Sequence, residues 1–493
     1  MNYHPSKEEF IKYSGKGNLI PVFGEILADF DTPLSAFSKI DSGGYSFLLE
    51  SVEGGERLAR YSFLGSSPYV IFSSKGNKVV LETGKSKKSF TSDDPIRELK
   101  DLLSKYKFVH VKGLPRFSGG LVGFLGYDMV RFMEDLPDKK ADKLDIPDSV
   151  FMLTDTLLVF DHVDHKIKIV SNVHVTGDPS RAYDDAVQKI NKIAGLLKKG
   201  GSKETSGVSL KHIVKPIALK SNLSKSGFEE AVKKAKEYIK KGDIIQVVLS
   251  QRLEVPFETQ PFQIYRALRS INPSPYMYYL KLGDFSLVGS SPEIMVRCEE
   301  GRVEVRPIAG TRPRGASEEE DKEQVKDLLA DPKERAEHVM LVDLGRNDIG
   351  RVCDFSSVKV SEFMSIEKYS HVMHIVTDVS GKLKKDKDVF DVMKATFPAG
   401  TVTGAPKVRA MEIIDELENT RRGPYAGAVG YFSFSGNLDC CITIRTILVK
   451  DKTAYIQAGA GIVADSVPEN EYQETLNKAK ALLKAIEMAE GGL

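Results

Sequence analysis

Cysteine is scarce in this chain, which contains four cysteines among 493 residues. No two of them form a Cys-x-x-Cys pair, and Cys440 and Cys441 are adjacent, so a zinc ribbon and a thioredoxin-like motif are excluded. Four cysteines are also too few for a disulfide scaffold. We therefore expect buried free thiols in a reducing compartment.

Net charge is nearly absent as well, because 70 basic residues balance 69 acidic ones to leave +1. Such a balance gives no reason to expect nucleic acid or an anionic membrane as a partner. No apolar run reaches the roughly 18 residues of a membrane-spanning helix, and the first residues carry charges of both signs instead of an apolar signal segment. These absences predict a cytoplasmic protein.

The composition is that of a soluble globular protein, with 41% hydrophobic and 28% charged residues. The length predicts about three domains or two large ones. Residues 200–211 are polar and rich in Gly and Ser, which suggests a surface connection. We therefore divide the chain into an N-terminal region, 1–205, and a C-terminal region, 206–493. This is a boundary of sequence only, since strands of both regions can share sheets in space.

Strand and helix patterns both occur along the chain. Residues 19–175 are rich in β-branched and aromatic residues punctuated by Gly, Asp and Ser, which predicts strands. Residues 224–243 predict a helix that begins with a capping box of Ser226 and Glu229 and stops at Gly242. Several strands are separated only by short turns. This favours antiparallel sheets over a doubly wound parallel one.

Two Glu-x-x-Glu units could hold a metal ion. Glu334 and Glu337 follow a helix start at Asp331, and Glu471 and Glu474 repeat the spacing in a second helix. Four carboxylates from two helices suit a hard cation such as Mg²⁺. The alternative is structural: Glu334 completes a capping box, and the other pair lies on a solvated helix face.

Glycine-rich turns provide a second set of features. Thr401 lies in a Gly-containing turn before a helix, and helix N-termini bind anions. Gly459 and Gly461 follow a strand, where small residues let a ligand approach the backbone. A tight turn is the simpler explanation for each.

Isolated polar residues in apolar surroundings form a third set. Arg445 lies in the apolar stretch CCITIRTILV, so it either forms a buried ion pair or faces a carboxylate ligand. Gln246 and Glu293 raise the same question at inward-facing strand positions. His374 has apolar neighbours and is either a core histidine or a functional one.

Together these motifs resemble the chorismate-utilising enzymes, and among them the large subunits of anthranilate synthases. The resemblance covers about residues 20–165 and 220–485. Its phrases include GDIIQVVLSQR, GSSPEIMVR, PIAGTRPRG, ERAEHVMLVDLGRNDIGR, HVMHIV, PAGTVTGAPKVRAMEIIDELE, RRGPYAGAVGY, CITIRT and GAGIVADSVPENEYQET. It implies an α+β fold in which two antiparallel β-sheets pack face to face with helices on the outside.

The resemblance also implies a reaction and its ligands. Chorismate is aminated at C2 with loss of the C4 hydroxyl, and pyruvate is then eliminated. Mg²⁺ would be held by Glu337 and Glu474, with Glu334 and Glu471 supporting it through water.

The same resemblance assigns the groups that contact the substrate. Arg445 and Tyr425 would bind the enolpyruvyl carboxylate, helped by the backbone at Gly459 and Gly461, because an arginine fork matches a carboxylate. Thr401 would lie near the ring carboxylate.

Protonation of the departing C4 hydroxyl has two candidates, Glu293 and His374. We favour His374 as the essential electrostatic and acid group.

Two positions separate the subfamilies. Relatives that add water to chorismate carry a lysine base where this chain has Gln246, and an ammonia nucleophile needs no such base. Aminodeoxychorismate synthases carry a nucleophilic lysine where this chain has Ala309 in PIAGT. Anthranilate synthesis is therefore favoured. Component I of aminodeoxychorismate synthase and a non-catalytic, tryptophan-sensing homologue are the alternatives.

The phrases LLES and NPSPYM resemble the family's inhibitor site for L-tryptophan. Glu50 and Ser51 would meet the ammonium group of the amino acid, and Pro275, Tyr276 and Met277 would meet its indole and backbone. The alternative is a simple strand and turn.

A glutaminase module is not evident, because none of the four cysteines has the sequence context of its nucleophile. We therefore expect ammonia from a separate glutamine amidotransferase subunit, and hence a hetero-oligomer.

Overall fold

A computed structural model describes the chain apart from residues 52–59, 139, 200–218, 370–371 and 493. The boundary placed between residues 205 and 206 lies outside the described residues and stays a prediction. Each of the two large sheets contains strands from both sides of that boundary. The N-terminal strands join the C-terminal ones where β3 (Tyr45–Glu50) pairs with β14 (Tyr276–Leu282) and where β8 (Gly120–Leu125) pairs with β22 (Ala428–Ser433).

The first sheet has thirteen strands among the described residues. In spatial order they are β1 (Tyr3–His4), β2 (Leu19–Leu27), β11 (Lys166–His174), β10 (Thr156–Asp161), β4 (Tyr61–Ser66), β3 (Tyr45–Glu50), β14 (Tyr276–Leu282), β15 (Phe285–Ser291), β24 (Thr446–Lys450), β25 (Thr453–Ile462), β13 (Gln246–Pro256) and β12 (Lys220–Ser221), with β21 (Gly404–Ala405) also paired to β13.

The second sheet has twelve strands among the described residues. In spatial order they are β18 (Ile308–Pro313), β20 (Val372–Lys382), β17 (Arg302–Val305), β16 (Ile294–Glu299), β23 (Leu438–Ile442), β22 (Ala428–Ser433), β8 (Gly120–Leu125), β9 (Ser149–Thr154), β5 (Val70–Lys75), β6 (Lys78–Thr83) and β7 (Ser86–Thr91), with β19 (Lys359–Lys368) also paired to β20. The strand pairs described in both sheets are antiparallel, which confirms that prediction.

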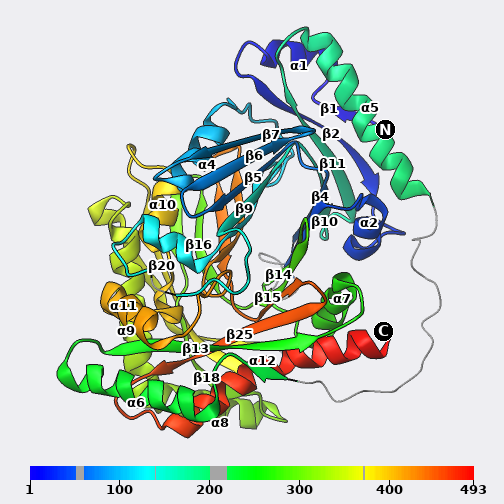
Figure 1. Ribbon diagram of the computed structural model, residues 1–493. Coiled ribbons are helices and arrows are strands. Elements are labelled where there is room, and N and C mark those ends of the chain that lie inside the picture. Colours follow the sequence, from blue (N-terminus) through cyan, green and yellow to red (C-terminus); the bar gives the residue numbers. More distant parts are fainter. Residues whose placement is uncertain (52–59, 139, 200–218, 370–371, 493) are drawn as a thin grey trace.

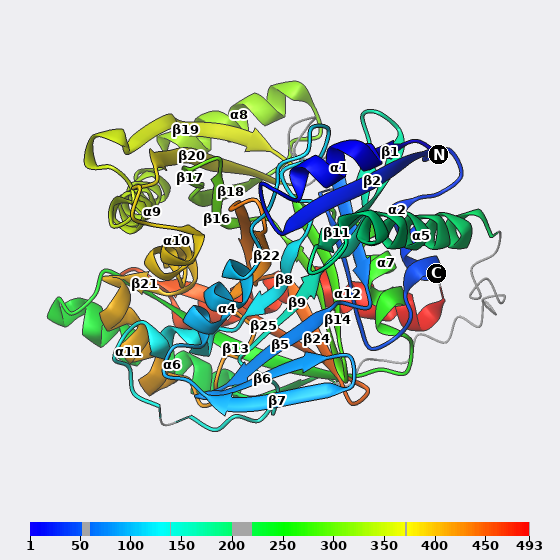
Figure 2. The ribbon, with the colours of Figure 1, turned by 90° about the horizontal axis from the view of Figure 1, so that it is seen from above.

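Helices surround the sheets on their outer sides (Figure 2). They are α1 (Lys7–Tyr13), α2 (Pro33–Ile40), α4 (Pro95–Ser104), α5 (Pro179–Lys198), α6 (Lys225–Lys241), α7 (Pro261–Ile271), α8 (Glu318–Ala330), α9 (Pro332–Gly350), α10 (Val389–Thr396), α11 (Lys407–Leu417) and α12 (Pro468–Gly491). None of the helices in the described part of the chain combines the length and apolarity needed to cross a bilayer.

A hydrophobic cluster fills the space between the two sheets. Phe63 of β4 and Tyr278 of β14 come from the first sheet, and Phe124 of β8 and Tyr431 of β22 come from the second. Alternate residues of these strands point inward, as period-2 patterning requires. The predicted fold of two face-to-face antiparallel sheets with helices outside is therefore confirmed.

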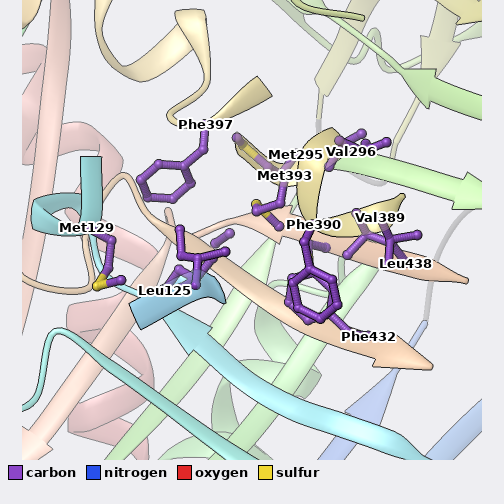
Figure 3. Packing of buried hydrophobic residues seen from close by; sticks show 14 of the residues in the cluster. Leu125, Met129, Met295, Val296, Val389, Phe390, Met393, Phe397, Phe432 and Leu438 are labelled. Carbon is purple, nitrogen blue, oxygen red and sulfur yellow. The ribbon is translucent and has the colours of Figure 1, made fainter. Parts of the chain in front are cut away.

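Separate clusters lie under the helices on the outer faces. On the first sheet, α1, α2, α5, α7 and α12 share one cluster, and Figure 1 shows α1 and α5 with β1, β2 and β11 at one end of the molecule. On the second sheet, α10 presents Phe390 to Phe432 of β22, with ring centroids 4.6 Å apart and nearly parallel planes. Figure 3 shows this contact beside Met295 and Leu438.

The two ends of helix α6 test the helix boundaries predicted from the local sequence. Its C-terminus is Gly242 with φ +83°, as predicted, because glycine adopts the left-handed conformation without steric cost. The predicted N-cap was wrong. Ser224 rather than Ser226 caps the helix, and its side chain accepts a hydrogen bond from the Gly227 amide.

Among the places where the chain passes from one sheet to the other, two neighbouring ones carry predicted site residues. One crossing, residues 292–293, joins β15 of the first sheet to β16 of the second, and the other, residues 443–445, joins β23 to β24. The Ile442 amide donates to the Glu293 carbonyl at 3.0 Å, and the Ser290 amide donates to the Arg445 carbonyl at 3.1 Å. The two crossings therefore lie side by side, each carrying one predicted site residue.

Candidate active site

Arg445 lies in the second crossing and not inside a strand, which corrects the sequence interpretation. Its φ of +50° is the left-handed conformation of a turn, and β24 begins one residue later. Burial lowers the pKa of Arg445, while Tyr425 and Glu474 act to raise it. The described carboxylates form no ion pair with its guanidinium. Of the two roles left open by the sequence, the buried ion pair is thus not formed with the described carboxylates, and binding of an anionic ligand stays a prediction.

Gly459 and Gly461 of β25 provide room for two neighbouring side chains. A Cβ atom at Gly459 would fall 2.6 Å from the Tyr425 hydroxyl, and one at Gly461 would fall 2.5 Å from the Gln246 amide nitrogen. Real Cβ atoms do not approach other atoms so closely, so these positions exclude side chains while Tyr425 and Gln246 stay in place. The two glycines thus allow protein side chains to approach the backbone, and the predicted approach of a ligand stays a prediction.

Gln246 is the first residue of β13 and connects the first sheet to α9. Its Nε2 donates to Glu337 Oε1 at 3.1 Å, and its own Oε1 is buried without a described partner. Glutamine cannot act as a base, so the position orients groups and does not remove a proton.

The α9 carboxylates lie on one face of the helix, next to β18. Asp331 caps α9 and accepts hydrogen bonds from the Lys333 and Glu334 amides, as predicted. Burial raises the pKa of Glu334, and the like charge of Glu337 adds to this, whereas Arg312 opposes it at 3.5 Å. The like charges of Glu334 and Glu337 repel each other, and a cation would relieve this repulsion.

The α12 carboxylates have similar electrostatics. Burial raises the pKa of Glu471, the Ser466 hydroxyl lowers it and Glu474 raises it. Glu474 forms an ion pair of 2.7 Å with Lys478, whose ammonium also donates to the Gly459 carbonyl at 2.9 Å. The described residues hold no group of three or more acidic, His or Cys side chains gathered around one point. The two pairs are therefore present but not assembled into one cation site.

His374 of β20 is oriented by β18. Its Nδ1 lies 3.0 Å from the Gly310 carbonyl and 3.1 Å from the Thr311 hydroxyl. A carbonyl can only accept, so Nδ1 carries the proton and Nε2 is the free acceptor. Burial lowers the pKa of His374, which the Gly310 carbonyl raises and Arg445 lowers. The ring is accordingly neutral at neutral pH.

Gly310 links His374 to the α9 carboxylates. It has φ +65°, and a Cβ atom there would lie 3.2 Å from Glu334 Oε2. Its carbonyl meanwhile holds the His374 ring. Histidine and carboxylate pair are thus neighbours across one glycine.

Glu293 occupies the first crossing and is buried. Burial raises its pKa to about 8, which the neighbouring Thr401 hydroxyl and the Lys478 ammonium only partly offset. Glu293 and Thr401 line a cavity of about 400 Å³, together with Gly400, Ile442 and residues of α9. Glu293 therefore carries a proton at neutral pH, in contrast to His374.

All five residues predicted to bind the inhibitor line a different cavity, of about 540 Å³, at the space between the sheets. They are Glu50, Ser51, Pro275, Tyr276 and Met277. The Glu50 carboxylate, however, points the other way: it accepts from Tyr265 at 2.5 Å and from Arg269 at 3.1 Å, both on α7. Its predicted contact with an ammonium group would need those bonds to rearrange.

Sequence reasoning missed a charged cluster in the same cavity. Asp439 of β23 accepts from the Tyr276 hydroxyl at 2.8 Å and from Arg297 at 3.3 Å, and it pairs with Arg116 at 3.3 Å. The signal was an aspartate beside the apolar residues of LDCCI. Its partners lie far away in sequence, so only the fold brings them together.

Residues 45–484 match a family described as chorismate binding enzyme. The chain belongs to this family. It is similar to the anthranilate synthase component 1 of Acetivibrio thermocellus and of Aquifex aeolicus (strain VF5), each 53% identical over 99% of both chains.

Solved structures agree with this membership. The crystal structure of anthranilate synthase component I from Streptococcus pneumoniae TIGR4 has a TM-score of 0.78 and 38% identity, covering 93% of this chain and 98% of that one. The menaquinone-specific isochorismate synthase of Escherichia coli, 18% identical with a TM-score of 0.71, shares the fold. The resemblance to anthranilate synthase large subunits is confirmed, and the protein is an enzyme of the chorismate-binding family.

In this chorismate-binding enzyme the cysteines are free and buried, as expected. Burial raises the pKa of Cys298 and of Cys353 to about 11, and it raises those of Cys440 and Cys441 further. A thiol must ionise to act as a nucleophile, so none of the four suits glutaminase chemistry.

Proposed function

We propose that this protein is the large subunit of an anthranilate synthase, which converts chorismate and ammonia into anthranilate, pyruvate and water in tryptophan biosynthesis. The observation that carries the proposal is the 53% identity with component 1 of two organisms over 99% of each chain. The geometry supports it, because Glu293 and Arg445 lie in adjacent crossings and Arg445 is near enough to Tyr425 and His374 to interact with them electrostatically.

The substrate side chain would be held at Arg445. Its guanidinium, unpaired with the described carboxylates, matches the enolpyruvyl carboxylate, and the buried Tyr425 hydroxyl adds one hydrogen bond. Because Gly459 and Gly461 lack side chains, Tyr425 and Gln246 can lie against the β25 backbone, where they would meet the ligand.

Glu293 would give its proton to the C4 hydroxyl, which leaves as water when ammonia forms the new bond at C2. The carboxyl group is buried at the crossing and protonated at neutral pH, as a general acid needs. This reverses our preference for His374. The neutral His374 ring, with Nδ1–H fixed by Gly310, offers Nε2 as an acceptor to position the substrate. Elimination of pyruvate with loss of the C2 proton then makes the ring aromatic.

We further propose that Glu337 and Glu474 bind Mg²⁺ directly and that Glu334 and Glu471 do so through water. Hard carboxylate oxygens fit this ion, and the like-charge repulsion within each pair would be relieved by it. Bound Mg²⁺ would supply Lewis-acid polarisation and a template for the ring carboxylate. Because the two pairs are not gathered without ligands, binding should need substrate, which itself brings a carboxylate.

Ammonia would come from a separate glutamine amidotransferase subunit, since the four buried thiols do not suit glutaminase chemistry. The relatives are named anthranilate synthase component 1, which supports the existence of a partner component. Free ammonium salt should replace this partner in vitro.

L-Tryptophan would inhibit by occupying the cavity between the sheets. Ser51, Pro275 and Met277, three of the residues predicted to contact the amino acid, line this cavity. The chain contains no tryptophan, so fluorescence selectively excited in an indole comes from the ligand alone. Binding can therefore be titrated directly.

The first experiment mixes the purified chain with chorismate, Mg²⁺ and excess ammonium salt, and follows anthranilate fluorescence. A signal that a chelator removes and L-tryptophan suppresses supports reaction, metal and regulation together. Consumption of chorismate without anthranilate would favour aminodeoxychorismate or isochorismate chemistry, which product mass separates. No consumption with a glutaminase partner added would contradict catalysis.

A further inference from the structure

Arg252 is a fully buried arginine in the middle of β13. Its exposed fraction is 2%, and it lies directly opposite Gln457 of β25 in the antiparallel pair. Neither residue belongs to the site described above.

The guanidinium of Arg252 has almost no partners among the described residues. Its Nη1 lies 3.5 Å from the Arg421 carbonyl, Nε and Nη2 have no hydrogen-bond acceptor, and no described carboxylate forms an ion pair with it. The Tyr455 ring lies 5.8 Å away. Glu254, Asp142 and Glu418 act on it only over longer distances. An unpaired buried charge is costly, so the site calls for a negative group.

Arg422, the other arginine beside this position, shows what a satisfied guanidinium looks like here. It donates to Glu418 at 2.6 and 3.0 Å and to the Val402 and Val248 carbonyls at 2.8 and 2.7 Å. Glu418 is thereby neutralised and is not available to Arg252. One positive charge therefore remains uncompensated.

A cavity of about 320 Å³ adjoins Arg252, and Gln457, Tyr455 and Tyr425 also line it. The Ser250 hydroxyl donates to Glu418 at 2.8 Å, so it must accept the 2.8 Å bond from Gln457 Nε2. This fixes the amide and leaves Gln457 Oε1 buried without a described partner. The pocket thus presents N–H donors at one residue and an acceptor at the residue opposite.

We propose that this cavity binds a small monovalent anion that carries one hydroxyl group, such as bicarbonate or a two-carbon hydroxy acid. Its negative oxygens accept from Arg252, and its hydroxyl donates to Gln457 Oε1. The cavity is small, which favours an anion of few atoms. Tyr425 forms one wall, so the anion packs behind a residue of the proposed substrate site. Anion binding itself does not depend on the proposed function.

Thermal unfolding of the full chain, at constant pH and ionic strength, tests this. Added bicarbonate or glycolate should raise the Tm of the wild type saturably by about 1–3 °C, and formate, which lacks the hydroxyl, should act only at higher concentration. If glycolate acts and bicarbonate does not, the site takes the hydroxy acid. Arg252→Met should remove the response, whereas the exposed control Arg346→Met should keep it. An unresponsive wild type, or an Arg252→Met protein that responds equally, would overturn the proposal.

A second variant avoids reliance on Arg252→Met, which could fail to fold. Gln457→Glu places a carboxylate directly opposite Arg252 and supplies the negative group from the chain itself. Its Tm without added anion should equal or exceed that of the wild type, and its response to bicarbonate should be lost. A wild-type response in Gln457→Glu would contradict the site.

Discussion

The cavity between the sheets and the site at the crossings differ in whether their charged groups are already paired. In the cavity, Asp439 pairs with Arg116 and Arg297 at 3.3 Å. Glu299 lies 3.7 Å from Arg116 and Glu304 lies 4.0 Å from Arg297, so both guanidinium groups have carboxylate partners without a ligand. At the crossings, Arg445 has no ion pair with described residues, and Glu293 keeps its proton. Burial is strong in both regions, so burial alone does not explain the difference.

The contrast is consistent with the ligands proposed for each region. A cavity whose charges are already paired can hold a neutral zwitterion at little electrostatic cost. A site that must bind a dianion and deliver a proton has to keep a cation and an acid uncommitted, and the fold pays for this in stability. Substitutions that remove single groups from either region test this comparison.

The largest effect is expected for Glu337→Gln. Loss of one proposed metal carboxylate should lower kcat with ammonium as nitrogen source by about 1000-fold, because Lewis-acid stabilisation is worth several kcal/mol. Anthranilate formation across a Mg²⁺ titration measures it, and Glu319→Gln, exposed on α8, is the matched control. Wild-type turnover and Mg²⁺ dependence in Glu337→Gln would remove this residue from the metal site.

Glu293→Gln should lower kcat by about 100-fold or more while KM for chorismate changes little, because only the transition state needs the proton. The pKa of Glu293 is raised to about 8, so its acid form prevails below that pH. The wild-type kcat should therefore fall as pH rises through 8, and the residual rate of Glu293→Gln should lack that fall. The exposed Glu300→Gln is the control. An unchanged pH profile in Glu293→Gln would return the role of acid to His374.

Much of this could be predicted from local sequence. Asp331 caps α9 and Gly242 ends α6 because caps depend on residues within one turn. The fold class followed from strand patterning and from the resemblance. The carboxylate pairs were predictable too, since their spacing of three fixes their common helix face.

The features that could not be predicted from the sequence depend on contacts between segments that are far apart in the chain. CCITIRTILV reads as one strand, yet the chain changes sheets within it, and Arg445 adopts a left-handed turn. The partners of Asp439 and the isolation of Arg252 depend on contacts made only after both sheets form. The preference for His374 over Glu293 rested on residue type, whereas burial at the crossing decides which group holds a proton.

In the cavity between the sheets, Ser51→Ala should weaken the binding of L-tryptophan by about tenfold, because one hydrogen bond to a charged group is lost. The ligand's own fluorescence gives Kd, and inhibition of the ammonia-dependent reaction gives the matching Ki. Catalysis without tryptophan should be unchanged, as in the control Ser361→Ala. Unaltered inhibition by L-tryptophan in Ser51→Ala would place the amino acid elsewhere.

The smallest effect is expected for Thr311→Val, which removes a hydroxyl 3.1 Å from His374 Nδ1 and keeps the side-chain shape. The Gly310 carbonyl, at 3.0 Å, still accepts from Nδ1–H and so maintains the tautomer and the ring orientation. kcat should therefore change by no more than about twofold, since the remaining bond carries the orientation. His374→Ala, measured alongside, removes the ring itself and should lower kcat far more. A Thr311→Val enzyme as slow as His374→Ala would mean that the hydroxyl, and not the backbone, sets the proton position on the ring.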